Sequence, residues 1–259
     1  MGLTLYRVEY GTPGGVPLMV VHGLFGAARN WRALARRFAL DRHVVCVDMR
    51  NHGASPWSNE MTYAAMADDL AAVIADLGGR ADVLGHSMGG KAAMVLAVTR
   101  PALVRALVVG DIAPAPYAHS QRPAIAAMRA LPPDAMVRRS AAQAALTEAT
   151  GDAGLGAFLA QSIDTGAAPP RWTLNLDALD SNMEAIIGFP ADLDGQFDGP
   201  TLFLAGARSD YVRPEHAARI RGMFPNTTHR AIAEAGHWLH ADKPQAFIGS
   251  VNRFLGTPG

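Results

Sequence analysis

The chain has 259 residues, enough for one large α/β domain or two small ones with a sizeable buried core. Lysine and arginine together number 23, as do aspartate and glutamate, so the formal net charge is zero. This balance, without any run of like charges, disfavours binding to nucleic acid or to an anionic membrane. Apolar residues make up 49% of the chain, which excludes a disordered protein.

The amino-terminal residues lack the basic head and apolar core of a secretory signal. No apolar run approaches the ~18 residues of a membrane span. The single cysteine, Cys46, has no internal disulfide partner and lies within an apolar run, so we predict a small buried hydrophobic residue there. We therefore expect a cytoplasmic protein.

The first 113 residues alternate strand-like apolar runs with helical patterns. The predicted strands are 3–10, 18–21, 43–47, 82–84 and 105–109, and the predicted helices are 31–38, 62–77 and 88–99. Asn30 and Thr62 are predicted to cap the first two helices. Continuous apolar runs are typical of strands covered on both faces, so these strands predict a buried sheet.

From Pro114 to about Pro200 the pattern changes, because no strand-like apolar run occurs there. The segment is rich in alanine and proline, with helical patterns at 124–131, 136–147, 155–163 and 176–187. We expect a helical lid, residues 114–199, inserted into a core formed by residues 1–113 and 200–259.

The α/β pattern resumes with a strand at 201–205, a helix at 214–224, a short strand at 230–232 and a closing helix at 244–255. Strands that alternate with helices predict an α/β fold with a mostly parallel, doubly wound sheet. In such a fold ligands bind beyond the carboxyl ends of the strands.

A candidate nucleophile lies between a predicted strand and a predicted helix, in Gly85-His86-Ser87-Met88-Gly89. This is the strand–turn–helix context of a nucleophile elbow, where small flanking residues let strand and helix approach closely. The turn would lift Ser87 above the sheet edge, at a helix N-terminus that favours a developing anion. By itself the motif also fits a glycine-flanked turn with an incidental serine.

A serine hydroxyl needs an adjacent base to act as a nucleophile. Of the nine histidines, His237 follows the last predicted strand in a Gly-His-Trp loop, which matches the chain order Ser, acid, His of hydrolases with this elbow. His86 should point away from the serine hydroxyl, and His22 and His52 fit structural hydrogen bonding near the site. We predict His237 as the general base.

Two aspartates qualify as the acid that orients the base. Asp210 follows the strand at 201–205, and Asp111 ends the strand before it. Either carboxylate would select the imidazole tautomer and stabilise its cation. Each aspartate also fits a structural role as a helix or turn cap, so the residues alone leave both open as the acid.

Backbone amides suffice for the oxyanion, and we expect Met88 and Leu24 to donate them. Phe25 and Trp238, with apolar residues of the lid, would form the acyl or alcohol pocket. No histidine, cysteine or carboxylate spacing indicates a metal, and no GxGxxG follows the first strand. We expect no metal and no cofactor.

Five motifs together resemble the YbfF-like esterases of the α/β-hydrolase superfamily, a group related to mitochondrial abhydrolases and alcohol acetyltransferases. They are His22-Gly23-Leu24-Phe25-Gly26, Arg50-Asn51-His52-Gly53, Gly85-His86-Ser87-Met88-Gly89-Gly90-Lys91, Asp111-Ile112-Ala113-Pro114 and Gly236-His237-Trp238. The resemblance spans nearly the whole chain, including residues 172–179 in the predicted lid.

The resemblance implies that Asp111 is the acid, because relatives often have no acidic residue at the position of Asp210. This sequence has an aspartate at both positions, so Asp210 is a rival. Asp177, which has also been suggested as the acid in relatives, lies in a predicted lid helix and is less plausible.

The resemblance also implies a small-molecule ester as substrate, with hydrolysis of short-chain carboxylic esters or thioesters through an acyl-enzyme. The alternatives with the same residues are a carbon–carbon bond hydrolase, a perhydrolase, a lyase of menaquinone synthesis, an alcohol acyltransferase, or a slow-turnover ligand receptor that retains the triad. The sequence leaves the acyl length and the oligomeric state open.

Overall fold

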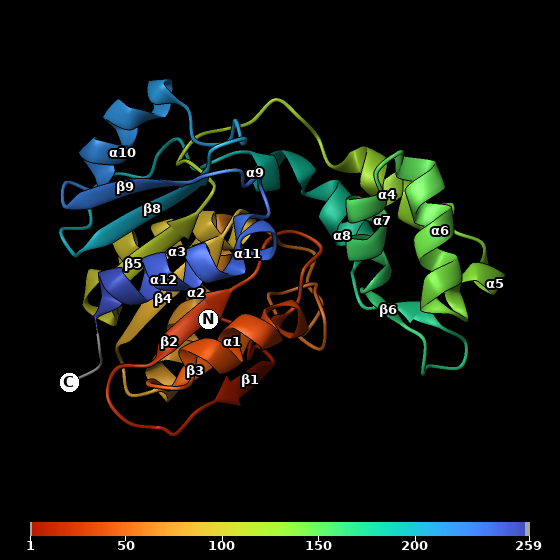
Figure 1. Cartoon of the computed structure of the whole chain (residues 1–259), viewed down its shortest axis with the longest axis horizontal. Coiled ribbons are helices and arrows are strands. Elements are labelled where there is room, and N and C mark those ends of the chain that lie inside the picture. The colour runs from red at the N-terminus through yellow and green to blue at the C-terminus, as the bar shows by residue number, and fades with distance from the viewer. Residues whose placement is uncertain (1, 257–259) are drawn as a thin grey trace.

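The computed structural model describes residues 2–256. Its main sheet has seven strands in the order β1-β3-β2-β4-β5-β8-β9 (Figure 1). The strands are β1 (Arg7–Tyr10), β2 (Leu18–Val21), β3 (Val44–Val47), β4 (Ala81–His86), β5 (Val104–Gly110), β8 (Thr201–Gly206) and β9 (Thr227–Ile232). Strand β1 is antiparallel to β3, and the other neighbouring pairs are parallel. The predicted α/β fold with a mostly parallel sheet is confirmed.

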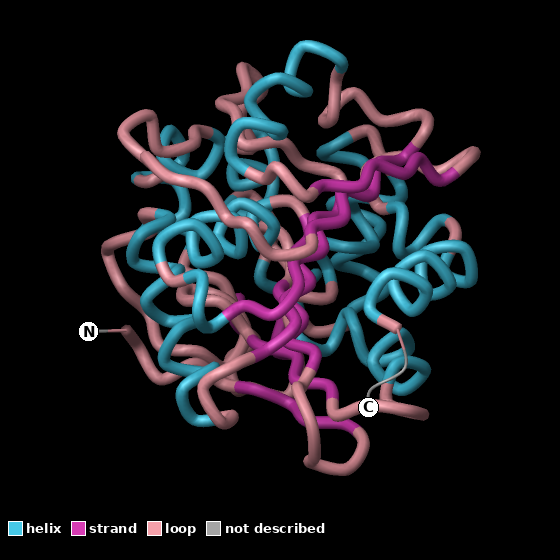
Figure 2. Tube along the Cα trace, turned by 90° about the vertical axis from the view of Figure 1, so that its left-hand side faces the viewer, coloured by secondary structure: helices cyan, strands magenta, loops and turns pink. Residues whose placement is uncertain are grey.

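Helices cover both faces of the sheet, which Figure 2 shows as a twisted band of strands between helices. Because successive strand residues point to opposite faces, β2 contributes Met19 and Val21 to one apolar cluster and Leu18 and Val20 to another. The first cluster includes α2 (Tyr63–Asp76), α3 (Met88–Thr99) and α10 (Ala217–Met223). The second includes α1 (Arg32–Phe38), α11 (Leu239–Asp242) and α12 (Pro244–Leu255). Cys46 belongs to the second cluster and is fully buried, as predicted.

Residues 114–199 are mainly helical, and Figure 1 shows α4–α7 beside the sheet rather than on one of its faces. The helices are α4 (Arg122–Arg129), α5 (Pro133–Met136), α6 (Arg139–Thr150), α7 (Ala153–Ala160), α8 (Leu176–Ser181) and α9 (Met183–Ile187). A short antiparallel ribbon, β6 (Ile163–Asp164) with β7 (Arg171–Trp172), was not predicted. Its strands have two residues each, too few for an alternating pattern.

The two predicted helix caps have different outcomes. Thr62 caps α2, because its hydroxyl accepts the amide hydrogen of Ala65 at 3.2 Å. The prediction for Asn30 is wrong: this residue lies inside a 3₁₀ turn, and α1 begins only at Arg32. The Asn30 side chain accepts the amide hydrogen of Ala27 at 2.7 Å, which closes that turn instead of capping the helix.

Candidate active site

Ser87 occupies the single residue between β4 and α3, with φ 53° and ψ −121°. A residue with a side chain rarely adopts a positive φ, and the surrounding structure must hold it there. A side chain at Gly85 would collide with the backbone of Gly89, and one at Gly89 would collide with the backbone of Val21. The two glycines therefore permit the close packing of strand and helix that keeps Ser87 on this sharp turn.

His237 joins Ser87 to Asp111 by two hydrogen bonds. Its Nε2 lies 3.1 Å from the Ser87 hydroxyl oxygen, and its Nδ1 lies 2.8 Å from Asp111 Oδ2. The Asp111 carboxylate is fully buried, and its Oδ1 accepts the amide hydrogen of Gly206 at 2.9 Å. This geometry is what a serine nucleophile, its base and an acid that orients the base require. The three residues follow β4, β9 and β5, whose carboxyl ends lie at one edge of the sheet.

The alternative acid, Asp210, is exposed, and within residues 2–256 it is Asp111 that bonds His237 Nδ1. Two neighbours of Asp210 reach the site instead, and sequence reasoning missed both. The Ser209 hydroxyl donates to Asp111 Oδ2, the oxygen that also contacts the imidazole. The Tyr211 ring stacks on His237 with 3.9 Å between ring centroids and 17° between planes. In the sequence, the position of Ser209 and Tyr211 in the loop after β8 was the one feature that could have indicated a place near the site.

His86 is another ring in contact with His237. Its Nε2 lies 2.8 Å from the backbone oxygen of His237, so the ring supports the loop of the base. Burial lowers the pKa of His86 well below its ordinary value, and the pKa of the neighbouring His240 to about 3. Both rings are therefore neutral near pH 7, and neither adds a positive charge beside His237.

The two expected oxyanion donors border the same cavity as Ser87. Met88 is the first residue of α3, so its amide has no acceptor within the helix. Leu24 precedes Phe25, whose backbone is held at φ 63°. The amide of Phe25 donates to His52 Nε2 at 3.1 Å, which fixes the course of the loop beside Leu24.

Two buried histidines support this loop as neutral hydrogen-bonding groups, as predicted. His52 Nδ1 donates to the backbone oxygen of Arg50 at 2.8 Å, which leaves Nε2 as an acceptor. His22 Nδ1 donates to the backbone oxygen of Gly23 at 2.7 Å, and its Nε2 accepts the amide hydrogen of Met49 at 2.9 Å. Burial lowers the pKa of His22 to about 4 and that of His52 to about 3, so both acceptors are available at neutral pH.

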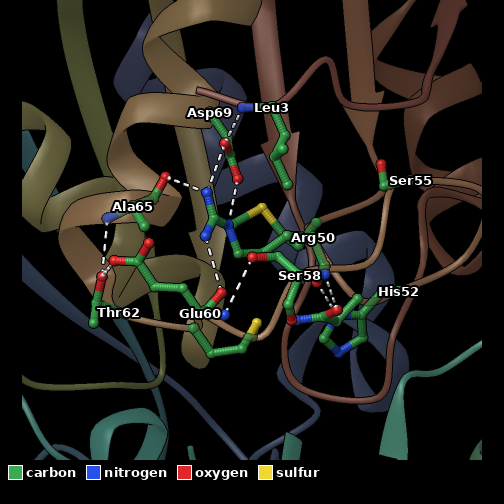
Figure 3. A network of polar contacts seen from close by, with 12 residues as sticks. Leu3, Arg50, His52, Ser55, Ser58, Glu60, Thr62, Ala65 and Asp69 are labelled. Atoms are coloured by element: carbon green, nitrogen blue, oxygen red, sulfur yellow. Dashed lines mark hydrogen bonds and ion pairs between the residues drawn. The ribbon is translucent and has the colours of Figure 1, made fainter. Parts of the chain in front are cut away.

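Arg50 anchors the segment that carries His52 to helix α2 (Figure 3). Its guanidinium donates to both oxygens of the buried Asp69 carboxylate, at 2.7 and 2.9 Å. It also donates to the backbone oxygens of Glu60 and Ala65. A buried ion pair in which every guanidinium nitrogen donates a hydrogen bond makes this loop a rigid support for His52.

A cavity of about 440 Å³ opens over Ser87 and His237. Phe25 and Trp238 both line it, together with apolar residues of α7 and α9. The Trp238 ring lies 5.7 Å from that of Phe158 on α7, so residues 114–199 form part of the cavity wall.

Lys91, one helical turn after Ser87, also reaches the cavity wall. Its ammonium donates to the backbone oxygens of Ile187 and Gly188, at 2.8 and 2.5 Å, and lies 4.6 Å above the Tyr117 ring. Burial lowers the pKa of Lys91 to about 7. The side chain thus links the nucleophile helix to the end of α9.

In residues 2–256 no three histidine, cysteine or acidic side chains are arranged to hold a metal ion. In the same residues no helix combines the length and the apolar character needed to cross a membrane.

Residues 16–244 match the family model described as alpha/beta hydrolase fold. The chain is 41% identical over 248 residues to the sn-1-specific diacylglycerol lipase ABHD11 of Mus musculus, covering 92% of this chain and 80% of that protein. It is 37% identical over 245 residues to Esterase YbfF of Escherichia coli strain K12, covering 92% of each. Among solved structures, a marine microorganism esterase has a TM-score of 0.92 and 33% identity, covering 98% of this chain and 100% of the other.

Proposed function

The chain belongs to the alpha/beta hydrolase fold family, and we propose that this carboxylic ester hydrolase is a serine esterase for short-chain esters. The observation that carries the proposal is the pair of hydrogen bonds from His237 to the Ser87 hydroxyl and to Asp111. The likeness to relatives named as esterases and lipases supports the same chemistry.

In the proposed first step, His237 Nε2 takes the hydroxyl proton of Ser87 while Oγ attacks the ester carbonyl. The amides of Leu24 and Met88 donate to the carbonyl oxygen as it becomes an anion. His237, now cationic, is held by Asp111 and returns the proton to the departing alcohol. The carbon–oxygen bond of the ester breaks, and an acyl group stays on Ser87.

In the second step His237 takes a proton from water, and the resulting hydroxide adds to the acyl carbonyl. Collapse of this intermediate breaks the bond to Ser87 Oγ, which regains its proton from His237, and releases the carboxylic acid. The same two amides serve both oxyanions, so one site catalyses both halves of the reaction.

We propose that residues 114–199 act as a lid that limits the acyl group. A volume of about 440 Å³ is near the lower end of the ~300–1,000 Å³ usual for ligand pockets. Phe25 and Trp238 would contact the acyl or alcohol part of the ester, with Phe158 opposite Trp238. This enclosure favours short acyl chains.

The test is the hydrolysis of p-nitrophenyl esters of increasing acyl length by the wild type and by Ser87→Ala. We expect turnover to be fastest with short chains, and Ser87→Ala to lose about 10⁴-fold or more in kcat. Ser250→Ala, which alters a hydroxyl on the outer helix α12, is the matched control and should behave as wild type.

Labelling by a fluorophosphonate separates the alternatives. Rapid labelling of Ser87 without turnover of any ester would contradict the esterase proposal and favour the slow-turnover receptor. Absence of labelling in the wild type would show that the serine is not activated, and the proposed mechanism would fail.

A further inference from the structure

The loop after β8 places an aromatic ring flat against the base. The Tyr211 and His237 rings are nearly parallel, with 3.9 Å between centroids, while His86 contacts the imidazole at a tilt of 42° and 4.8 Å. Both rings contact His237, and of the two the tyrosine ring is the one stacked parallel to the imidazole.

Several hydrogen bonds fix Tyr211. The Tyr117 hydroxyl donates to the backbone oxygen of Tyr211 at 2.6 Å and accepts the amide hydrogen of Ala113 at 2.8 Å. The Tyr211 hydroxyl lies 2.7 Å from His119 Nε2, so the far end of the ring is also tied. Backbone and ring are both constrained, which keeps the ring parallel to the imidazole.

The face of an aromatic ring carries partial negative charge and attracts a cation within about 6 Å. His237 becomes a cation when it takes the serine proton, so the stack is stronger in that state than with neutral imidazole. We propose that Tyr211 is a positioning residue that stabilises the cationic form of His237 during ester hydrolysis. This inference rests on the proposed function, since the cation forms when Ser87 is activated.

The other ionisable groups around His237 do not replace this contribution. Asp111 favours the cation through its hydrogen bond to Nδ1, at the edge of the imidazole ring. His86 and His240 are neutral near pH 7 because burial lowers their pKa values. The pKa of His119 is also lowered, chiefly by burial. The tyrosine face therefore favours the charged imidazole independently of the Asp111 carboxylate.

The direct test is an NMR titration of the histidine ring protons in the wild type, Tyr211→Phe and Tyr211→Leu, with His237→Gln to assign the signal. Without the ring, the midpoint of the His237 titration should fall by about half to one pH unit. Tyr211→Phe keeps the ring and should stay close to wild type in midpoint. The titration needs no substrate, so it tests the stack even if the esterase proposal fails.

The kinetic test is the pH profile of kcat/KM for p-nitrophenyl acetate. In Tyr211→Leu we expect the acidic limb to move to lower pH and the plateau to fall about three- to tenfold. In Tyr211→Phe the limb should stay in place, with a smaller loss at the plateau. A purely structural role would lower the plateau without moving the limb.

If Tyr211→Leu does not fold by circular dichroism, Tyr211→Met provides a second ring-free variant of similar apolar character. The proposal is overturned if the ring-free variant titrates His237 at or above the wild-type midpoint. It is also overturned if Tyr211→Phe shifts the midpoint as much as the ring-free variant does.

Discussion

Asp111→Asn probes the acid most directly, because the carboxylate is fully buried and accepts from three donors. One oxygen accepts from the Gly206 amide, and the other accepts from Ser209 and His237. An asparagine amide has one accepting end and one donating end. When its NH₂ group faces Gly206, the buried amide there loses its acceptor. When it faces Ser209 and His237, both of these groups must change from donors to acceptors. We expect the free energy of unfolding to fall by about 1–3 kcal/mol.

The loss of activity should be larger than the loss of stability. When the NH₂ group faces His237, Nδ1 must accept, and Nε2 then carries the hydrogen and cannot take the serine proton. The charge that stabilises the imidazolium is also gone. We expect kcat for p-nitrophenyl acetate to fall about 10³–10⁴-fold, as for a triad that has lost its carboxylate.

Asp210→Asn is the matched control, because Asp210 is exposed and one residue from both Ser209 and Tyr211. Its kcat should stay within about twofold of wild type, since exposed substitutions rarely perturb a site. A collapse of activity in Asp210→Asn, with Asp111→Asn nearly as active as wild type, would refute the assignment of the acid. Circular dichroism at the assay temperature checks that both variants are folded.

Three further predictions follow from contacts around the site. Ser209→Ala removes the hydroxyl that donates to Asp111, so kcat/KM should fall about three- to tenfold in the ester assay. The control Ser250→Ala should leave kcat/KM unchanged. Lys91→Met leaves the Gly188 backbone oxygen without its donor, whereas the Ile187 oxygen keeps the Tyr117 amide. The free energy of unfolding should fall by about 1–3 kcal/mol in urea denaturation, and an unchanged value would contradict this link. In the folded state the pKa of His22 is about 4 and that of His52 is about 3, both below the ordinary value of 6.5. Their contribution to stability is therefore complete above pH 6.5 and is lost progressively as the pH falls from 6.5 toward these folded values. The free energy of unfolding should decrease by about 1.4 kcal/mol per pH unit for each histidine, and equal values at pH 7 and pH 5 would refute this.

Most strands of the sheet and the sharp turn at Ser87 were predictable because both depend largely on neighbours along the chain. Apolar runs bounded by turn residues marked β2, β3 and β5 to within a residue or two. The glycines at 85 and 89 marked the turn at Ser87, although only the packing of Gly85 involves a neighbouring segment. Gly89 packs against Val21 and His22, which are distant in the sequence. The cap at Thr62 was predictable because it depends on residues close by in the chain. The Asn30 side chain can either cap the following helix or close the 3₁₀ turn, and the local pattern did not distinguish the two.

The residue patterns left two aspartates open as the partner of His237, and the tertiary structure shows the contact with Asp111. Asp111 and Asp210 both follow strands, but Asp111 comes directly after β5 and its backbone, at φ 49°, allows the carboxylate to meet the imidazole. Asp210 lies four residues beyond the end of β8, where the loop has carried it to the surface. The stack of Tyr211 on His237 likewise depends on segments far apart in the chain. Local patterns determine which elements form, but such contacts depend on the course of loops in three dimensions, which no local pattern encodes.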